Sequence, residues 1–370
     1  MVKVGFVGIG KIALDYLELI NENRVPDMQV GALCAHSEDS LSKMKVNAPW
    51  LNCIPSYTDY NEFLESGLFD GVIICTPHGK HPTMTMQALQ KGYHVLCEKP
   101  IGIDMQEVDA VKSYLIKHPN LQCGINYNRR KSKAFNKIKD LMDQGIIGEL
   151  VRATWVITNL YRTEAYYHSS PWRGKWSTEG GGILMTQASH QIDLMQWICG
   201  MPVKVMARCN TINRDIDVEN EAELFLDYAN GAHGYFIASA HECPGTNRFE
   251  ICGTKGRITI TEDSEVEIIR LSQDEPIFAK TCSSPFEKAP FTQEYLQFDD
   301  SADKIQQAAM LQDFAEAVVG KHTCACTYEE GSHSLEIIQG AYLSSWLEKA
   351  IHIPTDRVIF KKYYQKACEE

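Results

Sequence analysis

The chain has 370 residues, which is more than one hydrophobic core usually serves, so we expect two domains. Its formal net charge is −12 and its basic residues are scattered or paired with acids, which argues against DNA or RNA as a partner. No apolar run reaches the roughly 20 residues of a membrane span, so we expect no membrane partner. The thirteen cysteines are an odd number without repeated close spacing. Buried reduced thiols in a cytoplasmic protein explain them better than disulfides or a metal site.

Strand-like and helix-like patterns alternate through the first third of the chain. Apolar runs typical of buried strands lie at Val2–Val7, Met28–Ala35, Cys53–Tyr57, Gly71–Cys75, His94–Cys97 and Gln122–Asn126. Amphipathic runs typical of helices lie between them, at Ile12–Ile20, Glu38–Val46, Asp59–Leu64 (with Asp59 as N-cap), His81–Lys91 and Asp104–Lys117. This order predicts an α/β Rossmann domain with a doubly wound parallel sheet over residues 1–125. Ligands of such sheets bind at the carboxyl ends of the strands, so we expect the functional residues there.

A glycine turn follows the first predicted strand. Gly8-Ile9-Gly10-Lys11-Ile12-Ala13 has the G-x-G-x-x-A form of the dinucleotide fingerprint, between a strand and a helix. The first glycine permits the tight turn, and the second lets a pyrophosphate approach the backbone. The helix start presents unpaired N–H groups to the phosphates. We therefore predict that Gly8, Gly10, Lys11 and Ile12 bind a nicotinamide dinucleotide.

The end of the second strand usually selects between NAD and NADP. This chain has Ala35-His36-Ser37 there, and the carboxylates Glu38 and Asp39 come only after the expected strand end. His36 and Ser37 suit a 2′-phosphate somewhat better than a ribose diol, which favours NADP. Glu38 or Asp39 can still reach around to the ribose, so NAD stays open.

Two further loops follow strands at the same edge of the predicted sheet. In Cys75-Thr76-Pro77-His78-Gly79-Lys80-His81, proline stops the strand and the loop is expected to line the nicotinamide end of the crevice. Glu98-Lys99-Pro100 follows an apolar strand, where a charged pair is costly unless it is used or paired. A partly desolvated Lys99 suits proton exchange with a substrate hydroxyl. An ion pair at a strand end is the structural alternative.

These motifs resemble, in order and spacing over the first 125 residues, those of the glucose–fructose oxidoreductase, inositol dehydrogenase and rhizopine-catabolism (Gfo/Idh/MocA) family. Glu98-Lys99-Pro100 is the most specific element of the resemblance. The resemblance implies that Lys99 is the active-site lysine and that Glu98 helps to hold the nicotinamide ribose. It also assigns Thr76, Pro77 and His81 to the cofactor side.

From residue 126 the alternation ends, and residues 126–370 are expected to form a substrate-binding and oligomerisation domain. A helix at Ser132–Gln144 precedes strand candidates at Gly145–Thr158, Val203–Asn210, Glu221–Tyr228, Gly234–Ala240, Arg248–Cys252 and Arg257–Thr261. Consecutive strands with turn signals between them predict an α+β domain with a large open, mainly antiparallel sheet. Helices at Gln306–Val319 and Tyr328–Lys349 are expected to pack back on the first domain and the sheet. The resemblance implies a homodimer or homotetramer through the open sheet face.

Residues 159–182 form a long segment with little periodicity, rich in aromatic residues and arginine. Long loops of this kind tend to be functional or disordered. Aromatic faces stack on sugar rings and guanidinium groups bind carboxylates or phosphates in pairs of hydrogen bonds. A loop buried at an oligomer interface is the alternative, and the two roles are compatible. We assign to substrate binding Tyr161, Arg162, Tyr166, Trp172 and Arg173, together with Arg129. Arg129 belongs to the short basic run 129–131, which is expected to open an amphipathic helix, as a helix start or a small-anion contact.

The stretch Gly180-Gly181-Gly182 is expected to start a helix that packs closely against another element. Thr186, Gln187, His190 and Asp193 then fall on one helical stripe. The segment resembles the substrate-side helix of the same family, which implies that His190 is the proton-transferring partner of Lys99 and that Asp193 orients it. Inositol-type members carry an aspartate at the position of Thr186, which argues against free inositol and for larger or acidic sugars, including nucleotide-linked ones.

These observations predict an NAD(P)-dependent oxidoreductase that moves a hydride to or from a hydroxyl-bearing carbon of a sugar, sugar acid, nucleotide sugar or cyclitol. We expect Lys99 and His190 to meet beside the nicotinamide. Two alternatives stay open. One is a catalytically inactive dinucleotide-binding sensor or co-regulator, and the other is an NAD-assisted glycosidase on the same fold.

Overall fold

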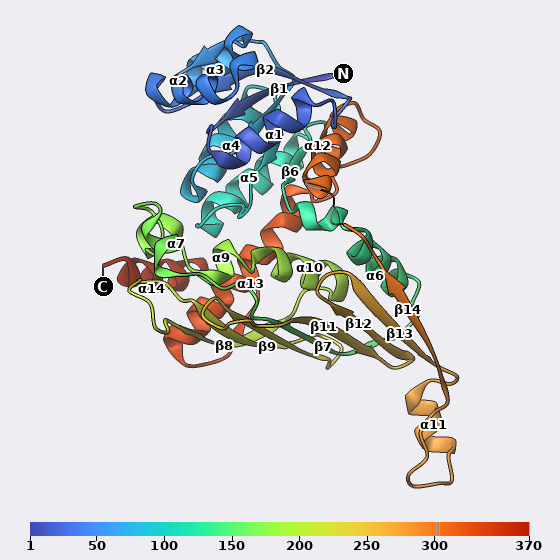
Figure 1. Cartoon of the computed structure of the whole chain (residues 1–370). Helices are drawn as coiled ribbons and strands as arrows, with labels where there is room; N and C mark the ends of the chain where they lie inside the picture. Colours follow the sequence, from blue (N-terminus) through green and yellow to red (C-terminus); the bar gives the residue numbers. More distant parts are fainter. Residues whose placement is uncertain (301, 303, 370) are drawn as a thin grey trace. The chain divides into compact units, whose positions relative to one another are not determined.

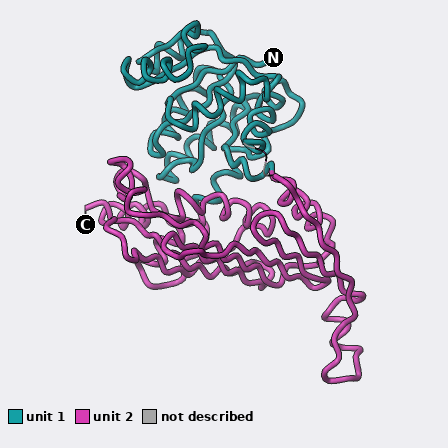
Figure 2. The backbone as a smooth tube through the Cα atoms, viewed as in Figure 1, with its two compact units in different colours: residues 1–131, 303–335 teal, residues 132–302, 336–370 magenta. Residues whose placement is uncertain are grey.

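A computed structural model describes residues 1–300, 302 and 304–369 of the chain, which divide into two compact units (Figures 1 and 2). Unit 1 comprises Met1–Lys131 and Asp303–Leu335, and unit 2 comprises Ser132–Ala302 and Glu336–Glu370. The sequence predicts a boundary after residue 125 and late helices that pack back on the first domain; unit 1 accordingly includes a late segment, and its first segment ends at Lys131. Among the described residues, none of the helices combines the length and apolarity needed to span a bilayer.

The sheet of unit 1 is parallel throughout, in the order β3-β2-β1-β4-β5-β6. Its strands are β1 (Val2–Val7), β2 (Met28–Cys34), β3 (Ser56–Tyr57), β4 (Gly71–Ile74), β5 (His94–Cys97) and β6 (Cys123–Ile125). The connecting helices are α1 (Lys11–Asn21), α2 (Glu38–Asn47), α3 (Tyr60–Glu65), α4 (His81–Gln90) and α5 (Met105–Lys117), with 3₁₀ turns η1 (Pro49–Cys53), η2 (His78–Lys80) and η3 (Asn128–Lys131). This is the dinucleotide-binding order of a Rossmann fold, and it confirms the fold class predicted for the first domain.

Local signals account for most boundaries in unit 1. The side chain of Asp59 accepts hydrogen bonds from the amides of Asn61 and Glu62, so it caps α3 as predicted. The strand predicted over Cys53–Tyr57 is shorter than expected, because Pro49–Cys53 form a 3₁₀ turn with proline in its first position. The basic run at residues 129–131 lies in η3 and does not open the following helix.

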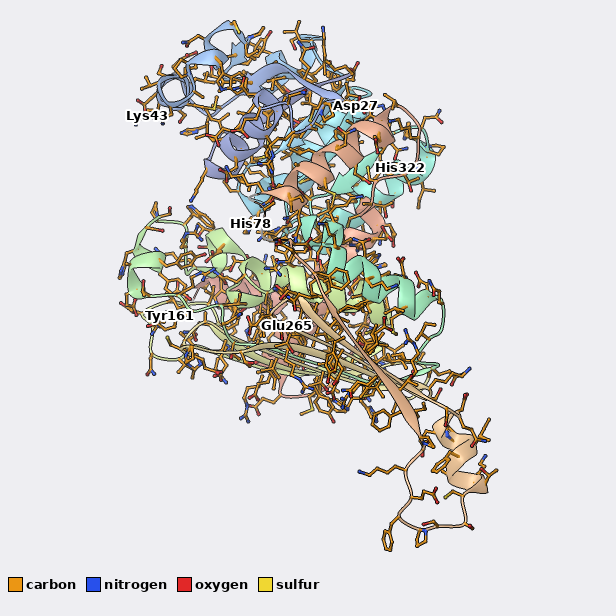
Figure 3. All side chains as sticks on the ribbon, turned by 45° about the vertical axis from the view of Figure 1, so that its right-hand side comes forward. Asp27, Lys43, His78, Tyr161, Glu265 and His322 are labelled. Carbon is orange, nitrogen blue, oxygen red and sulfur yellow. The ribbon has the colours of Figure 1, made fainter. Side chains whose placement is uncertain are left out.

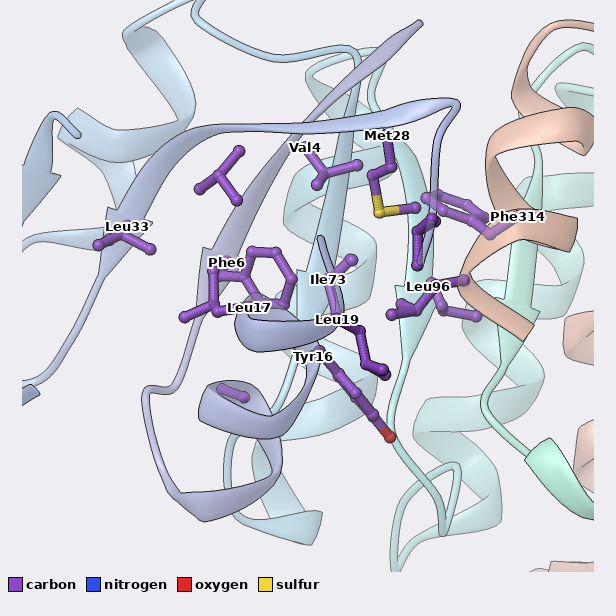
Figure 4. Close-up of a cluster of buried hydrophobic side chains, with 14 of the residues drawn as sticks. Val4, Phe6, Tyr16, Leu17, Leu19, Met28, Leu33, Ile73, Leu96 and Phe314 are labelled. Atoms are coloured by element: carbon purple, nitrogen blue, oxygen red, sulfur yellow. The ribbon is translucent and has the colours of Figure 1, made fainter. Parts of the chain in front are cut away.

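The hydrophobic core of unit 1 combines β1, β2, β4 and β5 with α1 and with α12 (Ile305–Val318), as Figure 4 shows. Phe314 of α12 is fully buried and lies over Gly71 of β4, where an added Cβ would come within 3.2 Å of the Phe314 ring. The bare backbone at Gly71 therefore makes room for an aromatic ring from a segment far along the chain. This contact explains why residues beyond 303 belong to the first unit.

Unit 2 holds a nine-stranded sheet in the order β14-β13-β12-β11-β7-β10-β9-β8-β15, in which only β7 and β10 pair in parallel. The mainly antiparallel sheet predicted for the second domain is confirmed. Its strands are β7 (Leu150–Ile157), β8 (Lys204–Asn210), β9 (Glu221–Asp227), β10 (His233–Ser239), β11 (Asn247–Gly253), β12 (Gly256–Thr261), β13 (Glu265–Leu271), β14 (Phe291–Gln297) and β15 (Ile351–His352). The hairpin of β13 and β14, with α11 (Glu275–Thr281) in its connection, was not predicted.

One face of this sheet is buried under helices and the other is not. Alternate residues of β7 point inward, and Trp155 stacks on Phe249 of β11 with ring centroids 4.3 Å apart. Figure 1 shows α9 and α10 on one side of the sheet and α11 beyond the end of the β13–β14 hairpin. The helices of unit 2 are α6 (Lys133–Asp143), α7 (Glu164–His168), α8 (Trp176–Glu179), α9 (Ile183–Thr186), α10 (Ser189–Cys199), α11 and α14 (Arg357–Glu369), and α13 (Tyr328–Leu347) runs from unit 1 into unit 2.

The triple-glycine segment does not form the single helix that was predicted. The carbonyl of Ile183 accepts hydrogen bonds from the amides of both Gln187 and Ala188, so the regular helical ladder ends there. A new helix, α10, begins at Ser189. Thr186 ends α9, whereas His190 and Asp193 lie in α10. The predicted single helix is therefore wrong, and the common stripe of Thr186, Gln187, His190 and Asp193 stays a prediction.

Candidate active site

The glycine turn after β1 leaves a polar cradle at the start of α1. Gly8 has φ +80°, and a Cβ there would lie 2.6 Å from the carbonyl oxygen of Cys75, so only glycine fits. Gly10 differs, since a Cβ at this position would meet nothing within 4 Å. No side chain caps the N-terminus of α1. The space above Gly10 and the uncapped amides together suit the pyrophosphate of a dinucleotide.

The loop after β4 also presents a polar group that a ligand can contact. Thr76 Oγ1 is buried and has no hydrogen-bond partner among the described residues. The following Pro77 is exposed, and His78 begins η2. An orphaned hydroxyl at the carboxyl edge of the sheet is a group that a bound cofactor can satisfy. The geometry at Gly8, Gly10 and Thr76 leaves room and unpaired polar groups for a dinucleotide. The cofactor roles of these residues and of Lys11, Ile12 and Pro77 stay predictions.

Glu98 is fixed at the end of β5 by groups from two other elements. Its Oε1 accepts hydrogen bonds from Tyr16 Oη of α1 (2.5 Å) and from Asn126 Nδ2 after β6 (2.8 Å). Burial raises the pKa of Glu98, and the hydrogen bond from Tyr16, the charge of Lys99 and the contact with Asn126 act in the opposite direction. The carboxylate is thus oriented before any ligand binds.

Lys99 is half-buried directly beside this carboxylate, and its amide donates to Glu98 Oε2 (3.2 Å). Burial raises the pKa of Glu98 and lowers that of His81; the positive charge of Lys99 opposes the first shift and adds to the second. The lysine therefore sits at the carboxyl edge of the sheet, as predicted, beside an acidic and a basic group.

His81 joins the two loops that end β4 and β5. It is fully buried, with Nδ1 2.8 Å from the carbonyl oxygen of Pro100 and Nε2 2.7 Å from that of Thr76. Burial lowers the pKa of His81 although both carbonyls favour its protonated form. His81 therefore connects the two loops from a buried position. Its predicted place on the cofactor side stays a prediction.

The end of β2 has no carboxylate in the strand itself. His36 is exposed and its ring nitrogens lie 3.4 Å from Ser40 Oγ. Ser37 caps α2 by accepting a hydrogen bond from the amide of Ser40 (3.3 Å). Asp39 forms an ion pair of 2.6 Å with Lys43, which Figure 3 labels. The hydroxyls and the imidazole are therefore the polar groups nearest the strand end, and Glu38 lies in the first turn of α2.

In unit 2, Tyr166 is the centre of a hydrogen-bonded group formed by predicted substrate residues. Its hydroxyl accepts from Gln187 Nε2 (2.8 Å) and from Arg173 Nη1 (2.5 Å). Thr186 Oγ1 lies 2.5 Å from Gln187 Oε1, which continues the row. The guanidinium of Arg173 also stacks on the rings of Tyr166 and Trp172, at 4.3 and 4.5 Å from the centroids.

Two more arginines border this group. Arg162 lies over the ring of Tyr166 at 5.1 Å, and Arg214 lies over the ring of Tyr161 (labelled in Figure 3) at 5.6 Å. Arg214 also donates to the backbone oxygen of Arg162 (2.8 Å). The buried carboxylate of Glu179 lies 3.6 Å from Arg173 and holds the adjacent turn. This part of unit 2 is thus rich in guanidinium groups and aromatic faces.

The remaining predicted residues lie in α10 and η3. His190 is half-buried in the first turn of α10. Asp193 is fully buried and accepts a hydrogen bond from Gln196 (3.1 Å), so its side chain lies beneath the surface. Arg129 is half-buried in η3 of unit 1. Lys99 belongs to unit 1 and His190 to unit 2, and their meeting beside a nicotinamide stays a prediction.

Two family models match the chain. Residues 2–127 match an oxidoreductase family with an NAD-binding Rossmann fold, and residues 135–259 match the Gfo/Idh/MocA C-terminal domain. The chain belongs to the Gfo/Idh/MocA family. The predicted family, and with it the prediction of an NAD-binding oxidoreductase, is confirmed.

Individual Gfo/Idh/MocA proteins resemble the chain over most of its length. The uncharacterized oxidoreductase YrbE of Bacillus subtilis is 25% identical and the match covers 96% of this chain and 98% of the relative. Myo-inositol 2-dehydrogenase of Thermotoga maritima is 25% identical, with 72% and 77% covered. The structure of the WlbA dehydrogenase of Bordetella pertussis, in complex with NADH and UDP-GlcNAcA, superimposes with a TM-score of 0.78 at 21% identity, covering 96% of this chain and 99% of that one.

Sequence reasoning missed several residues that shape the site. Tyr16 fits the apolar face of α1 and was interpreted only as a core residue. Asn126 was assigned to a strand, although its position just after β6 follows the rule that ligand-binding groups end parallel strands. Arg214 and Glu179 carry no local signal, because their partners lie in other segments.

Proposed function

We propose that the chain is a dehydrogenase or reductase acting on a hydroxyl-bearing carbon of a sugar-like substrate that carries an anionic group. The observation that carries the proposal is the row of Tyr166, Gln187 and Thr186, bordered by the guanidinium groups of Arg162 and Arg173. Hydroxyl and amide groups in a row match a polyhydroxylated ring, and guanidinium groups recognise carboxylate or phosphate. The substrate class includes sugar acids and nucleotide-linked sugars.

Two relatives support different parts of this proposal. A myo-inositol 2-dehydrogenase supports a polyhydroxylated substrate, and a structural neighbour solved with UDP-GlcNAcA supports an anionic one. Inositol-type members carry an aspartate where this chain has Thr186, which makes free inositol a poor candidate substrate. Acidic sugars are therefore the substrate class that we favour.

Bound nicotinamide supplies the hydride acceptor or donor for such a reaction. Lys99 Nζ, beside the oriented carboxylate of Glu98, is proposed to hold the substrate hydroxyl. As the hydride leaves for the nicotinamide during oxidation, the hydroxyl proton passes to a neutral base, either the amine form of Lys99 or the imidazole of His190. The imidazole of His190 is proposed to exchange the same proton, with Asp193 as its orienting residue. In the reductive direction the same groups return the proton to the forming hydroxyl.

For the cofactor we propose NADP(H) in preference to NAD(H), on the pattern at the end of β2. The imidazole of His36 and the hydroxyls of Ser37 and Ser40 are suitable for a 2′-phosphate. Asp39 is already paired with Lys43. The ratio of kcat/KM for NADP to that for NAD tests this preference, and a ratio below one contradicts it.

We also propose a homodimer or homotetramer in the cytoplasm. The outward face of β8, β9 and β10 exposes Met206 and Tyr235, with the half-buried Phe225 and Ile237 between them, a composition suited to a protein interface. All thirteen cysteines are free, which fits a reducing compartment. Light scattering on the purified chain measures its mass in solution, and a monomer would contradict the oligomer.

The central experiment is turnover of sugar acids, nucleotide sugars and neutral sugars with each cofactor, for the native chain and for Lys99→Met. The variant should lose turnover by at least about a thousandfold while its cofactor Kd, measured by fluorescence quenching, stays within about twofold. Undiminished turnover in Lys99→Met would exclude the mechanism. Binding without turnover of any substrate would favour a sensor, and tightly held cofactor that is never consumed would favour a glycosidase.

A further inference from the structure

Glu219 lies in the connection from β8 to β9, and its buried carboxylate binds the triple-glycine turn. Only 3% of the residue is exposed. Its Oε2 accepts a hydrogen bond from the amide of Gly182 (2.8 Å), and its Oε1 accepts from the amide of Leu184 (3.0 Å). Its own backbone oxygen accepts from the amide of Ile183 (3.0 Å). Three consecutive amides at the start of α9 are thus held by one residue.

The glycines of this turn are required by that contact. A Cβ on Gly182 would lie 1.7 Å from the backbone oxygen of Glu219. Gly181 has φ +148°, and a Cβ there would lie 2.2 Å from the hydroxyl of Tyr342, the third donor to the Glu219 carboxylate (2.8 Å). The glycines therefore allow the backbone to reach Glu219 and Tyr342 at hydrogen-bonding distance.

The turn bound by Glu219 is followed directly in the chain by candidate substrate residues. The carbonyl of Gly182 accepts hydrogen bonds from the amide and the hydroxyl of Thr186 (3.0 and 2.8 Å). Thr186 contacts Gln187, whose amide donates to Tyr166. A continuous set of hydrogen bonds therefore connects Glu219 to the row proposed to bind the sugar, and α10 with His190 follows in the chain.

We propose that Glu219 is a positioning residue for the reaction, and that its ionised carboxylate fixes the turn from which α9 and α10 present Thr186, Gln187 and His190. This inference rests on the proposed function for its link to turnover. The ionised form has free lone pairs on both oxygens for the amide and hydroxyl donors. If the carboxyl group of Glu219 were protonated, one of these donors would meet an O–H group or a weaker acceptor, and the turn would loosen.

The surroundings of Glu219 make its ionisation sensitive to pH near neutrality. Burial raises its pKa to about 7, against the hydrogen bonds from Leu184, Tyr342 and Gly182. The titratable groups that face it are Tyr342 of α13 and Cys209 of β8, whose own pKa values burial raises, so both stay neutral. Glu219, Tyr342 and Cys209 line a cavity beside the turn, and the exposed Asp217 lines it as well. Within the described residues, Glu219 forms no ion pair with a basic side chain.

Activity and stability should therefore respond to pH in opposite directions. A raised carboxyl pKa means that the folded chain binds a proton more tightly than the unfolded chain between about pH 4.5 and 7. The contribution of Glu219 to stability consequently increases as the pH falls through this window. Turnover should decrease over the same window, because the turn loses its ionised acceptor. If Glu219 had only a structural role, turnover and stability would not change in opposite directions with pH.

The test compares Glu219→Gln with Glu223→Gln, which changes an exposed carboxylate of the neighbouring β9. For Glu219→Gln we expect kcat reduced by about tenfold or more at pH 8, an unchanged cofactor Kd, and loss of the acid limb near pH 7 from the kcat profile. Hydrogen exchange in the peptide covering residues 180–188 should become faster. The Glu223→Gln variant should match the native chain in all four measurements.

Tyr342→Phe provides a second variant that keeps the carboxylate. Removal of a hydroxyl that stabilises the ionised form should move the acid limb of kcat to higher pH while the plateau at high pH is retained. A native pH profile in both variants, or native exchange of residues 180–188 in Glu219→Gln, would overturn the proposal. Failure of the proposed function is distinguishable, since it would appear as absent turnover in the native chain whereas the exchange measurement requires no substrate.

Discussion

The hydroxyl of Tyr16 in α1 lies 2.5 Å from Oε1 of Glu98 at the end of β5, and Asn126 Nδ2 lies 2.8 Å from both groups. Three elements of the Rossmann unit thus meet at one carboxylate beside Lys99. Because the contacts connect the helix that follows the glycine turn with the lysine loop, the two ends of the predicted cofactor site are mechanically linked.

Replacement of Tyr16 by Phe should lower the free energy of unfolding by about 1.5–3 kcal/mol at pH 8, because a buried charged acceptor loses a donor. The pKa of Glu98, already raised, should rise further without this hydrogen bond. The loss should therefore become smaller as the pH falls and Glu98 takes up a proton. Urea unfolding at several pH values measures both effects, with Tyr114→Phe, whose hydroxyl makes only a 3.5 Å contact, as the control. An equal loss at every pH would contradict the assignment.

The two glycines of the nucleotide turn should respond differently to alanine. Gly10→Ala should fold normally, since its Cβ points into open space, but should weaken NAD(P)H binding by about tenfold or more because the phosphates approach there. Gly8→Ala should lower the thermal midpoint, because a left-handed conformation costs alanine about 1–2 kcal/mol and its Cβ would clash with Cys75. Calorimetry and fluorescence titration of both variants separate the effects. Tight binding by Gly10→Ala would place the phosphates elsewhere.

The buried His81 should make the chain less stable in mild acid. Its pKa in the folded chain is lowered by burial, so below about pH 6.5 the unfolded chain binds a proton that the folded chain resists. Stability contributed by the neutral imidazole is therefore lost as the pH falls through about 6.5. In His81→Gln the decrease in unfolding free energy between about pH 7.5 and 5.5 should be smaller than in the native chain. Parallel curves for the two proteins would argue against this account.

Arg173 should distinguish acidic from neutral substrates. Arg173→Lys keeps a positive charge near Glu179 but loses the planar group that stacks on Tyr166 and Trp172. KM for a sugar acid should increase by about tenfold or more, and KM for the matching neutral sugar should change little. Arg208→Lys, on the exposed side of β8, serves as the control. Equal changes for both substrates would remove Arg173 from anion recognition.

Features that depend on neighbouring residues were predictable from the sequence. The alternation of apolar strands with amphipathic helices over residues 1–125, the glycine turn at Gly8 and the N-cap at Asp59 each depend on residues a few positions apart. The position of Lys99 at the end of a strand was predictable for the same reason. Local sterics and periodicity determine these elements, so a single chain displays them directly.

Other features depend on partners that are distant in the chain, and the tertiary structure alone decided them. The return of a late helix to the first unit was expected from the sequence, but the contact that holds it, Phe314 over Gly71, is visible only in the structure. The shared carbonyl of Ile183 divided one predicted helix into two. Glu219 carried no motif of its own, and its role is visible only where its carboxylate meets the amides of the glycine turn. Periodicity records which face of a segment is buried, whereas hydrogen-bond partners and close contacts depend on which segments fold against each other.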